Sequence, residues 1–191
     1  MKSFALVASA LVLSLAGCST TAPSAPAEAP PAHASQPCVL RGRLRRFVGE
    51  WRSSAVIEGE PGTPSQTLSG TERSRSLGGL WVVSEIRGES PTGAMEALMS
   101  LGYDPEKQRF VGTWVDSMTN HMWIYEGSLD SSGRVLTLQS KGPSFAGDGT
   151  LANYRDAFEF KADDHKVLTS SVEGPDGKWT TYLTVDYRRT K

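Results

Sequence analysis

Eight residues in the middle of this 191-residue chain have the types and spacing of a binding pocket for an amphipathic molecule. Aromatic rings supply apolar contact area, and an arginine among them supplies an anchor for a carboxylate or phosphate. The candidate ligand-binding residues are Trp81, Tyr103, Trp114, Asp116, Met118, Trp123, Tyr125 and Arg155. Strict alternation along strands cannot turn all eight to one side, and the same side chains could instead fill a solid interior.

Charged residues that fall among aromatic ones are the candidates for an internal polar patch, because a buried charge requires a partner. They are Glu85, Asp116, Glu126, Arg155 and Glu159, and they could also simply pair with one another. A carboxylate pair could serve a hydrolase or isomerase. The chain lacks the Gly-x-Ser-x-Gly, His-Glu-x-x-His, phosphate-loop and dinucleotide patterns, so no catalytic residue is assigned and a binding role is favoured over an enzyme.

Histidine chemistry is limited to His121 and His165 after residue 48. His121 lies near Met118 and Met122 and could ligate haem, but the late-strand histidine that the haem-binding nitrobindins would require is missing. A single histidine without further Cys or His ligands is also a poor zinc site. We therefore expect neither a cofactor nor a metal.

From residue 49 onward the chain is predicted to be all-β. Turn signals such as Asp-Pro-Glu, Asp-Ser-Ser-Gly and Gly-Pro-Asp-Gly separate runs rich in β-branched and aromatic residues. The predicted strands are 49–58, 66–76, 79–87, 100–104, 108–116, 121–129, 133–140, 150–161, 165–173 and 178–189, with one helical turn around Met95 to Met99. About ten sequential antiparallel strands close most simply into an up-and-down barrel, and a two-sheet sandwich is the competing architecture.

Alternation assigns the side chains of each strand to two faces. In the strand 150–161, Tyr154, Asp156, Phe158 and Phe160 share a face opposite Arg155. Aromatic residues at period two are typical of a barrel interior.

Two short signatures at the ends of this region resemble the calycin superfamily, the lipocalins and fatty-acid-binding proteins. Gly49-Glu50-Trp51 opens the first strand, and Tyr187-Arg188-Arg189 closes the last. The resemblance implies that Trp51 packs beneath a C-terminal arginine, Arg188 or Arg189, partly by cation–π attraction. Trp51 and Arg188 are therefore predicted to be structural.

A longer series of motifs is more specific. It comprises Leu101-Gly102-Tyr103-Asp104, then Trp114-Val115-Asp116-Ser117-Met118, then Glu126-Gly127-Ser128-Leu129-Asp130. In this order they resemble the bacterial family called domain of unknown function 1579, over essentially Leu44 to Arg189. The resemblance implies a lipocalin-like (calycin) barrel and brings no established activity.

The N-terminus resembles a bacterial lipoprotein signal. Lys2 and an apolar run from Phe4 to Leu15 precede the lipobox Leu15-Ala16-Gly17-Cys18. We expect cleavage before Cys18 and lipid attachment to it, with an ordinary signal peptide as the alternative. Because Ser19 and not Asp follows, the resemblance favours the periplasmic face of the outer membrane, with the lipid anchor making the membrane a partner.

Residues 18–37 are mostly Ala, Pro, Ser and Thr, with five prolines and one charged residue, Glu28. Such a composition predicts a disordered, semi-extended linker. The predicted organisation is therefore a signal peptide over 1–17, the linker over 18–37 and one barrel domain over 38–191.

Charge and cysteine usage narrow the possible partners. Without the leader, 19 basic residues stand against 21 acidic ones, and this near-neutral balance argues against nucleic acid as a partner.

One basic cluster lies at the start of the predicted domain. It could form the solvated face of a short helix that buries Leu40, Leu44 and Phe47, or it could contact anionic lipid. Its members are Arg41, Arg43, Arg45 and Arg46. If Cys18 is lipidated, Cys38 is a buried thiol or bridges two chains.

The sequence thus predicts a membrane-anchored periplasmic lipoprotein whose barrel binds a small hydrophobic or amphipathic ligand. An envelope structural or interaction protein with a filled barrel is the second interpretation, and a carboxylate-dependent enzyme is the third. Neither the ligand nor the oligomeric state follows from the sequence.

Overall fold

The computed structural model describes residues 40–59 and 63–191. The predictions for Cys18 and Cys38, for a signal peptide over 1–17 and for a linker over 18–37 lie outside these residues. A short helix covers residues 40–44. Ten strands follow: β1 (Gly49–Ile57), β2 (Gln66–Leu77), β3 (Trp81–Ser90), β4 (Gly93–Asp104), β5 (Arg109–Asp116), β6 (Trp123–Leu129), β7 (Val135–Pro143), β8 (Leu151–Ala162), β9 (His165–Glu173) and β10 (Trp179–Arg189). Within the described residues, no helix is long and apolar enough to cross a membrane.

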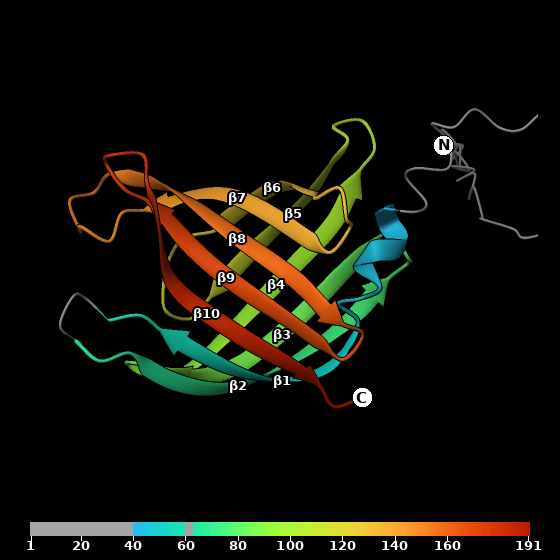
Figure 1. Cartoon of the computed structure of the whole chain (residues 1–191), viewed down its shortest axis with the longest axis horizontal. Helices are drawn as coiled ribbons and strands as arrows, with labels where there is room; N and C mark the ends of the chain where they lie inside the picture. The colour runs from blue at the N-terminus through green and yellow to red at the C-terminus, as the bar shows by residue number, and fades with distance from the viewer. Residues whose placement is uncertain (1–39, 60–62) are drawn as a thin grey trace, which may run out of the picture.

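The strands form one closed antiparallel barrel in which each strand pairs with its neighbours in the chain (Figure 1). Closure is made by β1 and β10, where Trp51 stands opposite Arg189 and Ile57 opposite Leu183. The predicted up-and-down barrel of about ten strands is confirmed, and the sandwich is excluded. Closure leaves no sheet edge with unpaired backbone groups.

The predicted helical turn around Met95 to Met99 is wrong, because these residues belong to β4. Met95, Ala97 and Met99 alternate with the exposed Glu96 and Leu98, so the segment has the period of a strand with one face inside. Pairing with β3, in which Ala97 stands opposite Ile86, holds it in the sheet.

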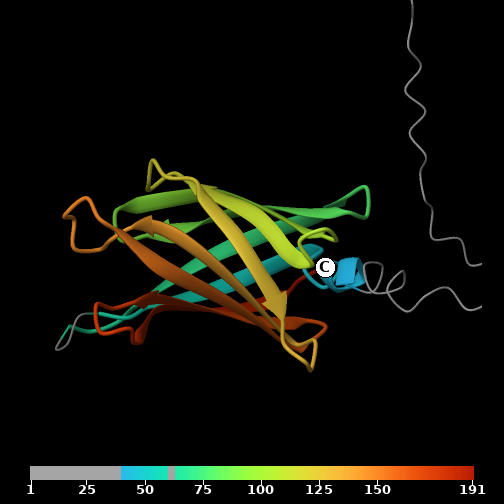
Figure 2. The same cartoon turned by 90° about the horizontal axis from the view of Figure 1, so that it is seen from above.

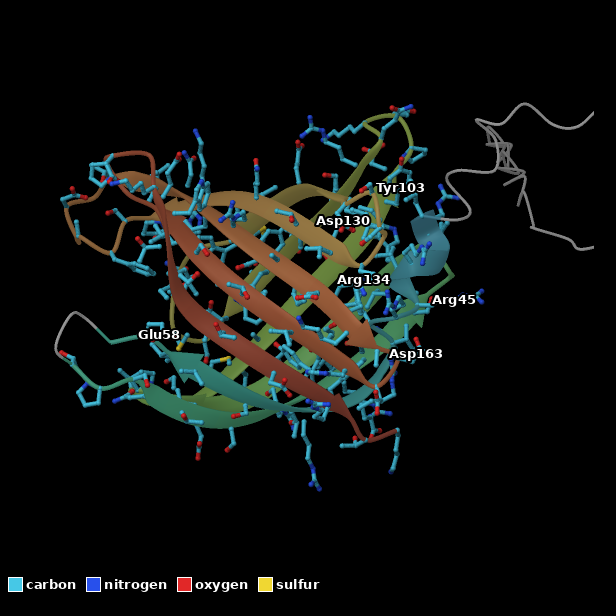
Figure 3. The ribbon with its side chains drawn as sticks, viewed as in Figure 1. Arg45, Glu58, Tyr103, Asp130, Arg134 and Asp163 are labelled. Atoms are coloured by element: carbon cyan, nitrogen blue, oxygen red, sulfur yellow. The ribbon has the colours of Figure 1, made fainter. Side chains whose placement is uncertain are left out.

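The two ends of the barrel differ. The end that holds the helix also holds the C-terminus and the β2–β3, β4–β5, β6–β7 and β8–β9 turns, and we call it the helix end (Figure 2). The opposite, or far, end holds the other five connections. In Figure 3, Arg45, Tyr103 and Asp130 lie at the helix end and Glu58 at the far end.

The helical segment plugs the helix end. Leu44 and Phe47 are buried, while Arg43 and Arg45 are exposed, as the amphipathic pattern predicts. The ring of Phe47 packs edge-to-face on Phe158 and Phe160, with ring centroids 5.2 and 4.9 Å away.

The arginine above Trp51 is Arg189. Its guanidinium carbon lies 4.0 Å from the centre of the indole ring, and it donates hydrogen bonds to the backbone carbonyls of Arg46 and Val48. Arg188 points outward and bonds Asp186, so the prediction that Arg188 is the structural arginine is wrong, and Arg189 covers Trp51 in its place.

Candidate ligand-binding site

Burial of the inward side chains changes along the barrel axis. In the helix half most of them are sealed: Trp51, Leu101 and Leu136 are no more than 1% exposed, and only Tyr103 and Leu129, beside the groove at the edge of that end, are partly exposed. At the far end several inward side chains remain partly exposed: Ala55, Met95, Trp114, Trp123 and Leu183. Because the closed sheet separates inside from outside, this partial exposure shows that the interior of the far half is accessible.

Asp156 forms the polar floor of this accessible half. Its carboxylate accepts a hydrogen bond of 2.6 Å from the hydroxyl of Tyr125, and Ser170 stands directly opposite it on β9. Burial raises the pKa of Asp156, while hydrogen bonds from Ser170 and Tyr125 oppose that rise. Burial also raises the pKa of Tyr125 and Tyr182, so both hydroxyls keep their protons near neutral pH.

Aromatic rings stand between this floor and the far end. Tyr154 contacts Trp123 edge-to-face with centroids 4.9 Å apart, and Tyr182 follows at 6.2 Å. Phe145 packs on Tyr154 and Tyr182 at 5.6 and 5.0 Å. The six-membered ring of Trp123 packs directly on Gly142, where an added Cβ would meet the ring at 2.1 Å, so only glycine permits this position.

The rim of the far end carries exposed apolar side chains. Met118, Met122, Phe145 and Leu151 are between 52% and 66% exposed. They come from the β5–β6 connection, the β7–β8 connection and the start of β8. An apolar rim around an accessible interior is the arrangement through which apolar molecules enter a barrel.

Asp116 holds the β5–β6 connection in place. One carboxylate oxygen accepts from the indole N–H of Trp114 at 2.9 Å, and the other accepts from the amides of Met118 and Thr119. The rim and the inward Trp114 are therefore positioned by one side chain. The arrangement gives Asp116 a structural task at this end of the barrel.

The structure brings together five of the eight predicted site residues. Four of them, Trp114, Asp116, Trp123 and Tyr125, lie on the inward face of the far half, and Met118 lies on its rim. The other three lie elsewhere.

Trp81 faces outward and covers the backbone of Gly102. Arg155 also faces outward and stacks on Trp179, with its guanidinium carbon 4.4 Å from the ring centre. Tyr103 lies at the helix end, beside a groove of about 330 Å³ that Leu40 and Arg43 also line.

Sequence reasoning missed Asp156, Ser170, Tyr154 and Tyr182 as site residues. Alternation had already placed Asp156 on an aromatic face, and a carboxylate among inward aromatics was the available signal. Tyr182 could not be found in this way, because a β-bulge between Thr181 and Leu183 turns it toward Tyr154.

Most of the charged residues expected to form an internal polar patch lie on the outer surface. Glu126 pairs with Lys107 at 3.2 Å and Glu159 with Lys161 at 2.6 Å, while Glu85 is exposed. Alternation correctly separated the side chains of each strand into two faces. Because both faces hold apolar residues, the sequence did not show which face is inward. The carboxylates deep inside are Glu72 and Asp156.

Glu72 is part of a sealed ion pair at the helix end. The ammonium of Lys166 lies 2.9 Å from both oxygens of Glu72, and the two side chains are 0% and 3% exposed. Ser74 and Ser84 donate to the same carboxylate. Burial lowers the pKa of Lys166 and Glu72 opposes that change. Because no surface is accessible, this pair is structural.

In residues 40–59 and 63–191, no group of three or more His, Cys, Asp or Glu side chains is placed to hold a metal ion. His121 bonds the carbonyl of Lys141 at 3.0 Å, and His165 bonds Asp186 at 2.6 Å.

Comparison with known proteins identifies a family. Residues 36–189 match the family described as "Protein of unknown function (DUF1579)". No curated protein matches the chain.

Two solved structures share the fold. An S-type phycobiliprotein lyase, CPES from Guillardia theta, aligns with a TM-score of 0.53 at 13% identity, covering 80% of this chain and 93% of that one. Rv2717c from M. tuberculosis aligns with a TM-score of 0.57 at 10% identity, covering 80% and 98%. At such identities the likeness shows the calycin-like barrel alone.

Proposed function

The chain belongs to this family of unknown function, and from that premise we propose that it binds a small hydrophobic or amphipathic molecule in the far half of its barrel. The observation that carries the proposal is the burial gradient. The helix end is sealed by Phe47 and Trp51, whereas inward residues such as Trp123 and Leu183 remain partly exposed. A barrel plugged at both ends would seal both halves equally.

The lining suits an amphipathic ligand. Ala55, Met95 and Leu183 offer apolar contacts, Trp123 and Tyr154 offer rings, and the Tyr125–Asp156 pair offers hydrogen bonds at the floor. A few convergent polar groups within an apolar lining are characteristic of small-molecule sites. The phycobiliprotein lyase of similar fold is a second barrel of this shape.

Filling the far half tests this proposal. Ala55 faces inward on β1, and its neighbour Ser54 faces outward, so Ala55→Trp and Ser54→Trp place the same bulk on opposite sides of one strand. The full chain is titrated with the neutral fluorescent probe N-phenyl-1-naphthylamine, and circular dichroism checks that both variants are folded. We expect Ala55→Trp to weaken probe binding at least about tenfold and Ser54→Trp to leave it unchanged.

Two outcomes would contradict the proposal. One is the absence of probe binding to the wild-type chain, together with no ligand in native mass spectrometry of protein purified from its own envelope. The other is an equal effect of both variants, which would place the probe on the outer surface. Either result would favour the filled-barrel interaction protein.

We also propose that the barrel is anchored through Cys18 to the periplasmic face of the outer membrane. The lipobox Leu15-Ala16-Gly17-Cys18 and the residue Ser19 support this proposal. In Gram-negative cells, Cys18→Ser is expected to abolish labelling by palmitate and to release the chain from the membrane fraction. Labelling of the variant at the wild-type level would contradict the anchor.

A further inference from the structure

The barrel contains one completed ammonium site, built from its own residues. The ammonium of Lys166 lies 2.9 Å from both oxygens of Glu72. The same nitrogen lies 4.5, 4.6 and 5.0 Å from the ring centroids of Trp51, Tyr187 and Phe47. A carboxylate together with aromatic ring faces is the environment that a desolvated cation requires.

The far half contains the same types of partner without the cation. Asp156 is surrounded by hydroxyl and aromatic side chains from Tyr125, Tyr182 and Ser170, and Trp123 and Tyr154 form the next layer. Among residues 40–59 and 63–191, no Lys, Arg or His side chain lies within ion-pair distance of Asp156. Its charge is thus balanced only by hydroxyl groups.

We infer that the molecule bound in the far half carries an ammonium group, primary or alkylated, which occupies at Asp156 the place that Lys166 occupies at Glu72. This inference rests on the proposed binding function and names the chemistry of the ligand's polar end. The aromatic rings between Asp156 and the rim then hold the apolar part of the same molecule.

An acidic ligand fits this half poorly. Of the basic residues on nearby strands, Arg155 faces outward onto Trp179, and Lys141 and Lys178 are exposed. A carboxylate or phosphate at the floor would face Asp156 with no cation beside it, and like charges in a desolvated site repel strongly. The anion-binding role expected of Arg155 is therefore replaced by a cation-binding role for Asp156.

The test compares ligands that share an eight-carbon chain. Octylamine, octyltrimethylammonium, octan-1-ol and octanoate are titrated below their micelle concentrations into the full chain, with intrinsic tryptophan fluorescence and calorimetry as readouts. We expect both ammonium ligands to bind at least about tenfold more tightly than octanol, and octanoate to bind most weakly.

Asp156→Asn keeps the shape of the side chain and removes its charge. It is expected to erase the preference of octyltrimethylammonium over octanol. The matched control is Glu58→Gln, which removes one negative charge from the exposed surface of the far end (Figure 3). This control is expected to retain the preference, because an exposed charge is screened by solvent.

A pH series separates Asp156 from general charge effects. Octyltrimethylammonium keeps its charge at every pH, so its affinity should fall on acidification as Asp156 takes up a proton. The titratable groups facing Asp156 are Tyr125, Tyr182 and Tyr187, whose pKa values are all raised by burial, so they stay neutral throughout. His121 contacts Trp123, so Asp156→Asn serves as the control: it should abolish the pH dependence if Asp156 is its source.

The outcomes distinguish the two proposals. If none of the four ligands binds and the fluorescent probe also fails, the binding function itself is wrong. If octanol or octanoate binds as tightly as the ammonium ligands, or if Asp156→Asn keeps the preference, the barrel binds ligands but the ammonium inference is wrong. Should Asp156→Asn fail to fold, the ranking of the four ligands on the wild-type chain decides alone.

Discussion

The two halves of this barrel each bury a carboxylate, and they treat it in opposite ways. At the helix end Glu72 is sealed with Lys166 and two serine hydroxyls, beneath Phe47 and Trp51. In the far half Asp156 has only hydroxyl partners and lies within an interior that remains accessible. The same closed sheet therefore holds a carboxylate paired with a cation at one end and, among the described residues, a carboxylate with only hydroxyl partners at the other.

The difference indicates how such a barrel divides stability from function. The helical segment brings Leu44 and Phe47 into one end, and sealing that end excludes water from the ion pair. The far end has no such plug among the described residues. Phe145 packs there on the ring of Tyr154 and is still 66% exposed. Substitutions at the helix end should therefore change folding stability, and those at the far end should change binding.

The largest expected effect is that of Lys166→Met. It leaves Glu72 buried without a cation and should lower the free energy of unfolding by about 3–5 kcal/mol. Urea denaturation followed by circular dichroism measures the loss. The double variant Glu72→Leu/Lys166→Met should recover most of it, and a single variant as stable as the double one would show that the pair is not coupled.

The next effect comes from one substitution made at both ends. Phe47→Ala removes a ring that is 1% exposed and should cost about 3–5 kcal/mol of folding free energy. Phe145→Ala removes a ring that is 66% exposed and should cost less than about 0.5 kcal/mol. Thermal and urea unfolding provide the comparison, and similar losses at both sites would contradict the division between the ends.

A smaller effect separates the two C-terminal arginines. Arg189→Met removes hydrogen bonds to the carbonyls of Arg46 and Val48 and the contact with Trp51, and should cost about 1–3 kcal/mol. Arg188→Met, on the exposed face, should change stability by less than about 0.5 kcal/mol. The reverse order in urea unfolding would show that Arg188 is the structural residue after all.

The smallest effect is that of Asp156→Asn on stability, and its sign depends on pH. Because burial raises the pKa of Asp156, the folded chain holds this proton more tightly than the unfolded chain. Ionisation therefore costs stability as the pH rises from the unfolded pKa through the folded one. The neutral asparagine should make the chain more stable than wild type at neutral pH, by a change on the order of 1 kcal/mol.

The stabilisation should disappear below about pH 4, where Asp156 is protonated in both states. Urea unfolding at several pH values measures this dependence. An asparagine variant that is less stable than wild type at neutral pH, and equally so in acid, would show that the hydroxyl bonds outweigh desolvation.

Much of the fold followed from local patterns. Turn residues and period-two alternation placed all ten strands, and the boundaries of β9 were predicted without error. The failure at Met95 to Met99 has a local cause, since Ala, Met, Leu and Glu favour helices and only pairing with β3 and β5 overrides that preference.

Less of the site could be predicted. Trp114, Trp123 and Tyr125 were found because aromatic residues at period two must lie on one face. Trp81 and Arg155 were misplaced because both faces of their strands carry apolar residues, and the choice between faces depends on curvature of the whole sheet. The position of Tyr182 depends on a β-bulge, and no short sequence motif predicts that bulge.

The sequence by itself determined the strands outside Met95 to Met99, their alternation and the family, because each of these depends on residues that are close together in the chain. Tertiary structure decided which arginine covers Trp51, which end is sealed, and that Lys166 reaches Glu72 across 94 positions of chain while Asp156 meets only hydroxyl groups. These relations arise from closure and register, which join residues that are distant in the chain. Local periodicity carries no information about such pairings.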